Sequence, residues 1–114
     1  MTARDEIAAA ASTVDGVECA AFYQAATEPG AAWVERTSTQ YTQNLHPSYG
    51  AKAYWRVTVV MPDDVVAAEE WIEANQQTLV EAIHEAMTVQ SATPQTISQT
   101  DSPSLKVLTI DGHS

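Results

Sequence analysis

The chain has 114 residues, a length typical of one domain, and its 15 acidic and five basic residues give a formal net charge of −10. This balance argues against a protein that grips nucleic acid or an anionic membrane surface, because both contacts rely on Lys and Arg. The single cysteine, Cys19, excludes an internal disulfide framework and the multi-cysteine zinc patterns.

The N-terminal part of the chain predicts one helix and two strands. Residues 2–14 have apolar side chains at helical spacing and predict a short helix. Residues 17–24 predict a strand with Phe22 on the core face, and residues 32–39 predict a second strand. The short link between these strands, with a turn at residues 27–30, predicts a hairpin.

Residues 40–50 show no periodicity and predict a loop. Its side chains Tyr41, Leu45 and Tyr49 form a candidate interface, because loops on rigid scaffolds often make the contacts of a protein. The alternative is a loop whose aromatic side chains fold back onto the sheet.

Residues 51–61 alternate in the manner of a strand. The face predicted to lie on the core consists of Trp55, Val57, Val59 and Met61. The opposite face consists of Tyr54, Arg56, Thr58 and Val60. This second, mixed face suits a central strand that another subunit partly covers, or a solvated face of an antiparallel sheet.

A long amphipathic helix is predicted over residues 64–85. Pro62 ends the preceding strand, and Asp63 or Asp64 can cap the free N–H groups of the first turn. Its predicted buried stripe consists of Val65, Ala68, Ile72, Leu79, Val80 and Ile83. No Lys or Arg occurs between Arg56 and Lys106, so packing rather than ion pairing must hold this helix.

Residues 87–91, 95–99 and 105–110 predict further strands, of which the last one or two close the sheet. The predicted fold class is α+β: one antiparallel or mixed β-sheet with two helices packed on one face, in the order α-β-β-β-α-β-β. Residues 1–114 form a single domain in this interpretation. No apolar run approaches the roughly 20 residues that span a bilayer, so we expect a soluble protein without a membrane partner.

The sequence offers little catalytic chemistry. It contains none of the common nucleotide-binding, metalloprotease or serine-hydrolase motifs. Asp63-Asp64 could bind a divalent ion but suits a helix cap better, and His84 suits the cation-favouring end of a helix better than a functional base. We therefore expect no catalytic, metal-binding or cofactor-binding residues and no enzymatic activity.

Three segments carry a resemblance to a known family. They are RDEIAAAASTVDGVECAAFY, WRVTVVMPDDVVAAEEWIEANQQTLVEAI and SLKVLTIDG, which together cover nearly the full length. A short helix before a DG turn, an apolar strand that ends in MP before a long acidic helix, and a final LTIxG strand resemble the tail terminator proteins of long non-contractile-tailed phages, especially those of actinobacteria. The long loop at residues 40–50 is a departure from this pattern.

The resemblance implies a structural virion protein. Tail terminators form a ring, commonly a hexamer, that caps the tail tube, stops tube polymerisation and presents the surface that joins the head. The implied partners are further copies of the chain, the major tail tube protein and a head–tail connector or stopper protein. The implied location is the neck of the virion tail, after assembly in the host cytoplasm.

The acidic helix suggests where DNA would pass. We expect some of its glutamates to line or approach the channel, because a channel that passes DNA without binding it should be acidic or neutral. The candidates are Glu69, Glu70, Glu73, Glu81 and Glu85. The alternative is an ordinary solvated helix face.

Two other kinds of function remain open from the sequence. One is another ring protein of the same connector, such as a head–tail stopper or a tail completion protein. The other is a small acidic binding module, which would mimic nucleic acid or neutralise a basic partner and would be a monomer or a dimer.

Overall fold

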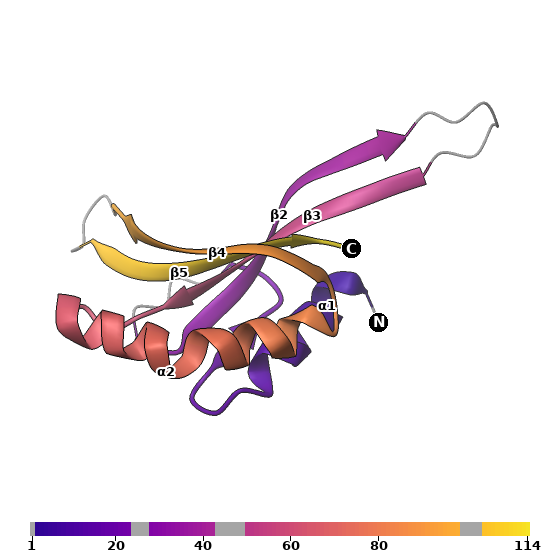
Figure 1. Cartoon of the computed structure of the whole chain (residues 1–114). Helices are drawn as coiled ribbons and strands as arrows, with labels where there is room; N and C mark the ends of the chain where they lie inside the picture. Colours follow the sequence, from indigo (N-terminus) through magenta and orange to yellow (C-terminus); the bar gives the residue numbers. More distant parts are fainter. Residues whose placement is uncertain (1, 24–27, 43–49, 99–103) are drawn as a thin grey trace.

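The computed structural model describes residues 2–23, 28–42, 50–98 and 104–114, and Figure 1 shows the arrangement of their helices and strands. The elements are α1 (Ala3–Ser12), β1 (Glu18–Ala20), β2 (Ala31–Thr42), β3 (Gly50–Val60), α2 (Val65–His84), β4 (Thr88–Ile97) and β5 (Leu105–His113). The predicted α+β class and the order α-β-β-β-α-β-β are confirmed.

The five strands form one mixed sheet in the order β1-β2-β3-β5-β4. Strand β3 is central, as predicted, and it pairs antiparallel with both β2 and β5. The predicted hairpin between the first two strands is wrong, because β1 runs parallel to β2 with Glu18 opposite Ala31. Parallel pairing requires a connection that returns the chain to the end where the first strand began, so a tight hairpin turn cannot join β1 to β2.

Both helices lie on one face of the sheet, and the main core forms between these layers (Figure 1). Helix α1 contributes Ile7 and Ala11, and α2 contributes Leu79 and Ile83. The predicted core face of β3 is confirmed: Trp55, Val57, Val59 and Met61 are all buried in this cluster.

Local signals explain where the helices begin. Thr2 and Asp5 form a reciprocal capping box at α1, and the Oδ2 atom of Asp64 accepts a hydrogen bond of 3.0 Å from the backbone N–H of Ala67 at the start of α2. The predicted stripe of α2 is wrong at Val65, which is 64% exposed. Val65 occupies the first position of the helix and lines an open groove instead of contacting the sheet closely.

The opposite face of the sheet has a smaller buried cluster of Trp33, Val60 and Val107. The predicted mixed face of β3 is therefore divided: Thr58 and Val60 are buried, whereas Tyr54 and Arg56 are half-buried. Phe22, predicted on the core face, is 67% exposed. Strand β1 ends at Ala20, so the alternation of a strand does not extend to Phe22.

The two strands predicted at residues 87–91 and 95–99 are one continuous strand, β4. This strand has Pro94 in its middle and a register shift between Val89 and Ser91. Proline is tolerated there because β4 is the outer strand of the sheet, where one side of the backbone needs no ladder partner.

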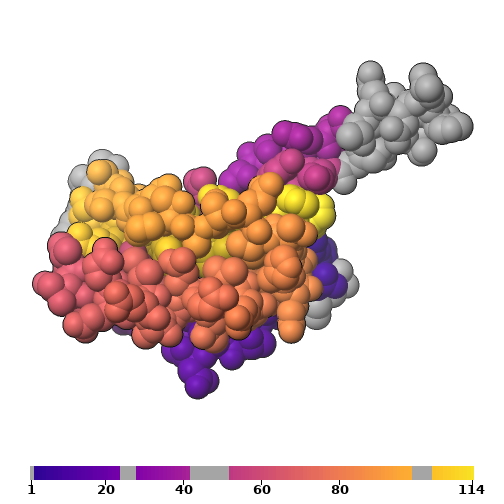
Figure 2. Space-filling view, viewed as in Figure 1, coloured from indigo at the N-terminus to yellow at the C-terminus, as the bar shows by residue number. Residues whose placement is uncertain are grey.

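The loop predicted at residues 40–50 is partly wrong, because β2 continues through Thr42 and β3 begins at Gly50. Beyond the pair Tyr54–His113, strand β3 pairs with β2 alone. Residues 38–42 and 50–53 thus form a two-stranded ribbon, called the arm below, which projects from the body of the protein in Figures 1 and 2.

Candidate functional site

The five candidate glutamates are all exposed; Glu69, Glu70, Glu73 and Glu81 lie on α2, and Glu85 is its C-cap residue. Helix α2 contains 20 residues and no Lys or Arg. The Nε2 group of Gln77 donates a hydrogen bond of 3.0 Å to Oε1 of Glu81 one turn away. The glutamates therefore form a strongly negative surface stripe with no positive side chain from their own helix.

The candidate interface residues of the predicted loop are only partly within the described residues. Tyr41 lies on the arm portion of β2 and is 70% exposed. Leu45 and Tyr49 lie outside the described residues. Of the three candidate side chains, Tyr41 can thus be placed, and it projects outward rather than folding back onto the body of the sheet.

A cluster of basic and aromatic side chains lies at the base of the arm. The Cζ atom of Arg36 is 4.8 Å from the centroid of the Trp55 ring, and the Cζ atom of Arg4 is 5.3 Å from the same centroid. Arg4 also lies 4.3 Å above the ring of exposed Phe22. Such cation–π contacts hold guanidinium groups in a defined position while leaving charge at the surface.

Arg4 is fixed in place by hydrogen bonds as well. Its Nη1 group donates to the backbone oxygens of Ala21 and Val34, both at 2.9 Å. These contacts tie the first turn of α1 to the segment after β1 and to β2. The position of this guanidinium group is therefore set by three separate parts of the chain.

The pairing register assigns side chains to the two faces of the arm. Residues directly opposite in an antiparallel pair share a face, so Arg36 lies with Trp55 while Gln40 lies with Lys52. The bulge between Arg36 and Ser38 brings Tyr41, which pairs with Ala51, onto the same face as Arg36. We call the set Arg4, Phe22, Arg36 and Tyr41 the shelf.

The face of the sheet opposite to the helices contains an ion pair within the subunit, between β3 and β5. The Nε atom of Arg56 lies 2.8 Å from Oδ1 of Asp111 on the neighbouring strand β5. The hydrogen bond to Asp111 raises the pKa of Arg56, so this guanidinium remains charged and bound. Among the described residues, Arg36 has no such carboxylate partner.

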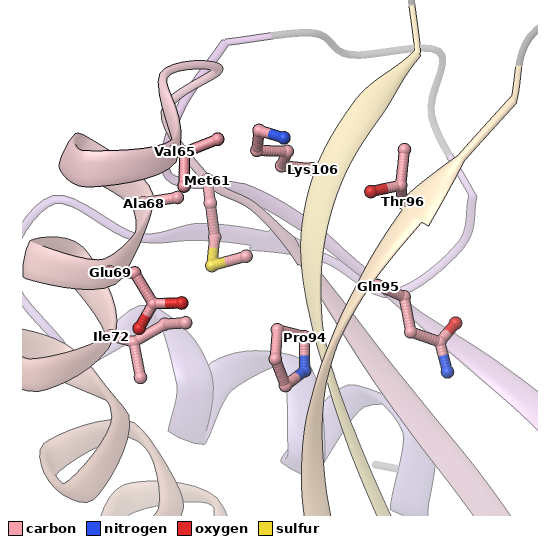
Figure 3. Close-up of a pocket in the computed structure, with 9 residues that line it drawn as sticks. All are labelled: Met61, Val65, Ala68, Glu69, Ile72, Pro94, Gln95, Thr96 and Lys106. Carbon is pink, nitrogen blue, oxygen red and sulfur yellow. The ribbon is translucent and has the colours of Figure 1, made fainter.

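A groove of about 230 Å³ separates the first half of α2 from β4 and β5. Figure 3 shows the side chain of Met61 extending into it, with Ile72 and Glu69 on the helix side and Pro94 on the strand side. Lys106 lies near its upper end in this view, whereas Gln95 turns away. The groove is smaller than the cavities that usually hold organic ligands, and it adjoins exposed Val65.

The residues weighed above as a metal ligand or a functional base, Asp64 and His84, have structural roles. Asp64 caps α2, and Nδ1 of His84 accepts a hydrogen bond of 3.3 Å from the backbone N–H of Val89, which stabilises the turn into β4. Burial raises the pKa of the Cys19 thiol to about 12. Within the described ranges, no three His, Cys, Asp or Glu residues lie close enough together to hold a metal ion.

Sequence reasoning named Tyr41 as a candidate interface residue but missed the other three residues of the shelf. The relevant arginines are 32 positions apart in the chain, and no local pattern joins Arg4 to Arg36 or Phe22. The parallel pairing of β1 with β2 is what brings these segments together. The sequence contains an indirect signal for a basic surface in this part of the protein, because four of the five basic residues precede Val57.

In the part of the chain that the structure describes, no helix has the length and apolar character needed to cross a membrane.

Comparisons with known proteins do not assign the chain to a family. No protein-family model matches the sequence, and no curated protein matches it significantly.

Proposed function

We propose that this protein is a phage tail terminator, a subunit of a ring that caps the tail tube and stops its polymerisation. The observation that carries the proposal is the separation of charge within one subunit. Arg36 at the base of the arm and Lys52 on the arm are exposed and have no carboxylate partner among the described residues, whereas Arg56 is paired with Asp111. The acidic residues of α2 form a separate surface.

Such a distribution favours contacts between different surfaces of identical subunits. Head-to-tail contacts of this kind produce a closed ring when the rotation between neighbours closes, whereas identical surfaces meeting each other produce dimers. The resemblance of the three sequence segments to tail terminators supports the same conclusion. The ring, commonly a hexamer in that family, would contact the tube protein on one side and present the other side to the head–tail connector.

In this proposal the tail DNA passes through the ring without being bound. Some of the exposed glutamates of α2 line or approach the channel, where negative charge repels the phosphate backbone. An outer position for the whole of α2 in an assembled ring would contradict this part of the proposal.

The test of the function is tube length. The purified protein is added to polymerising major tail protein of an actinobacterial phage, and tube lengths are measured by negative-stain electron microscopy. The proposal expects a ring at one end of each tube and shorter tubes as the protein concentration rises. Unchanged length distributions with bare ends would overturn it, and rings that bind portal or connector proteins but no tube would assign the chain to the stopper or completion class.

The exposed acidic stripe of α2 also favours a second candidate, a small acidic module that binds a basic protein. That function requires no assembly, so it predicts a monomer or dimer at all concentrations. Light scattering on the pure protein, alone and with tail tubes, separates the two candidates.

A further inference from the structure

The arm needs a neighbour more than any other described part of the protein. It consists of two strands, and isolated two-stranded ribbons are marginally stable in water. Figure 2 shows the arm extending away from the body, and Tyr41 exposes 70% of its surface there. A partner surface that covers the arm would therefore bury the exposed ring of Tyr41 and would also stabilise the two-stranded ribbon.

The composition of the shelf is that of an interface centre. Aromatic residues and arginine are enriched at the centres of protein interfaces and dominate their binding energy. Arg4 and Arg36 are held against Trp55, so binding would cost these side chains little additional conformational entropy. The shelf is positive, and a partner must therefore offer apolar groups among negative ones.

The first half of α2 has this complementary character. Val65 and Val66 are 64% and 63% exposed, so two adjacent apolar side chains lie on the surface at the start of the acidic helix. Glu70 lies one helical turn after Val66, and Glu73 lies almost two turns after it, on the same side. We call Val65, Val66, Glu69, Glu70 and Glu73 the acidic patch.

We propose that the shelf of one copy of this chain docks onto the acidic patch of the next copy. This inference rests on the proposed ring and names the contact that builds it. In Figure 1 the start of α2 lies at the end of the body far from the arm, so the two surfaces of one subunit cannot meet each other. Distinct surfaces at opposite ends give a head-to-tail contact, as a ring requires.

The contact also divides the glutamates of α2 by role. Glu69, Glu70 and Glu73 face the neighbouring subunit, while Glu81 and Glu85 lie in the second half of the helix or just beyond it and stay outside the contact. The latter two are then the acids that remain for the channel.

The experiment reverses one charge on each surface. Arg36→Glu reverses one of the two positive charges of the shelf, and Glu70→Arg reverses one of the negative charges of the acidic patch. In sedimentation velocity over a concentration series, the wild type forms oligomers that weaken at high salt, and each variant alone associates at least about tenfold more weakly because like charges now meet.

An equimolar mixture of the two variants gives the decisive result. The glutamate introduced in the first variant then meets the arginine introduced in the second, and native Arg36 of the second meets native Glu70 of the first. Every contact of an alternating ring is thus complementary, and the mixture regains the wild-type oligomer if its subunit number is even. A mixture that stays as weakly associated as its components overturns the inference.

Matched controls distinguish this contact from general charge effects. Lys52→Glu makes the same charge change on the opposite face of the arm, and Glu85→Arg makes it at the C-cap of the same helix. Both are expected to associate as the wild type does. Circular dichroism checks folding, and Tyr41→Ser, at an exposed position, replaces Arg36→Glu if that variant does not fold.

The outcomes separate this contact from the proposed function. Oligomers that form equally well in every variant, or a wild type that is monomeric at all concentrations, overturn the contact. The function is judged separately by the tube-length assay, because a ring built through other surfaces would still cap tubes.

Discussion

The indole N–H of Trp55 donates a hydrogen bond to the hydroxyl of Ser114, with 3.2 Å between Nε1 and Oγ. Trp55 is buried in the central strand, whereas Ser114 is exposed and follows the end of β5. The backbone N–H of Ser114 also donates to the oxygen of Ala53 at 3.0 Å. The last described residue of the chain is therefore fastened to the base of the arm.

Replacement of Ser114 by Ala is expected to lower the free energy of unfolding by about 0.5–1.5 kcal/mol, because the buried indole N–H loses its partner. Urea denaturation monitored by far-ultraviolet circular dichroism measures the difference. Ser104→Ala, at another exposed serine, is the control and should change stability little. Equal losses at both positions would contradict a specific role of the hydrogen bond.

Truncation of the main core is expected to be far more costly. Trp55→Ala should lower the free energy of unfolding by about 3–5 kcal/mol and Ile83→Ala by about 2–5 kcal/mol, because both side chains are fully buried between helices and sheet. Thermal denaturation compares them with Thr78→Ala on the exposed side of α2. Near-normal stability in both core variants would refute the assignment of the core.

Gly30 is expected to resist substitution for two reasons. Its φ angle of +94° is unfavourable for residues with a Cβ atom, and a Cβ there would lie 2.1 Å from the backbone oxygen of Gly16. Gly30→Ala should therefore destabilise the protein by more than about 1–2 kcal/mol.

Gly16→Ala is the matched control for this effect. Gly16 has a similar φ angle of +82°, but a Cβ atom there meets nothing within 4 Å. Its substitution should cost only the backbone term of about 1–2 kcal/mol. Denaturant midpoints of the two variants measure the difference, and equal midpoints would show that the close approach to Gly16 is unimportant.

The thiol of Cys19 is expected to be unreactive in the folded protein. Burial raises its pKa from 9.0 to about 12, so little of the nucleophilic thiolate exists near neutral pH. Iodoacetamide labelling followed by mass spectrometry should be slow in buffer and fast in denaturant. Fast labelling of the folded protein would contradict the burial of this side chain.

The same shift makes stability depend on pH in a defined direction. Between the pKa of the unfolded thiol near 9 and that of the folded thiol near 12, the folded state retains a proton that the unfolded state has lost. The free energy of unfolding should therefore fall as pH rises through this range. Cys19→Ala should show a smaller fall, and identical slopes for wild type and variant would contradict the prediction.

The long helix was the most predictable part of the fold. Its apolar period, the proline before it and its capping aspartate are local signals, and the predicted residues 64–85 agree with α2 and its two caps. Trp55 and its neighbours on the core face of β3 were predictable for the same reason, since alternation along a strand is also a local property.

The direction of β1 was not predictable, because a gap between two strands has the same appearance in a sequence whether the chain turns back or crosses over. The continuity of β4 was missed since Pro94 breaks a central strand but not an outer one. Val65 was wrongly placed in the buried stripe because it is the first residue of α2, at the open end of the groove, and helical spacing alone does not show which end of a stripe reaches the sheet.

The candidate site was predictable in part. The exposure of the glutamates followed from their places around the helix, whereas the sequence left open whether Tyr41 projects outward or folds back onto the sheet. The shelf was not predictable, because Arg4, Phe22 and Arg36 meet only after β1 and β2 have paired in parallel.

The outer strands of the sheet have a consequence for the size of any assembly. Pro94 has no amide hydrogen, and the register shift after Val89 interrupts the backbone of β4 nearby, while β1 at the other edge has only three residues. An additional strand from another molecule would find a broken row of donors at β4 and a short one at β1, so these two strands oppose fibre growth by adding strand to strand. Strand β1 covers β2 only at residues 31–33, and β3 beyond Tyr54 pairs with β2 alone, so the longer free backbone edges lie along β2 and the arm. Open-ended growth through the body of the sheet is therefore disfavoured, and a backbone ladder between copies of the chain is expected only along β2 and the arm.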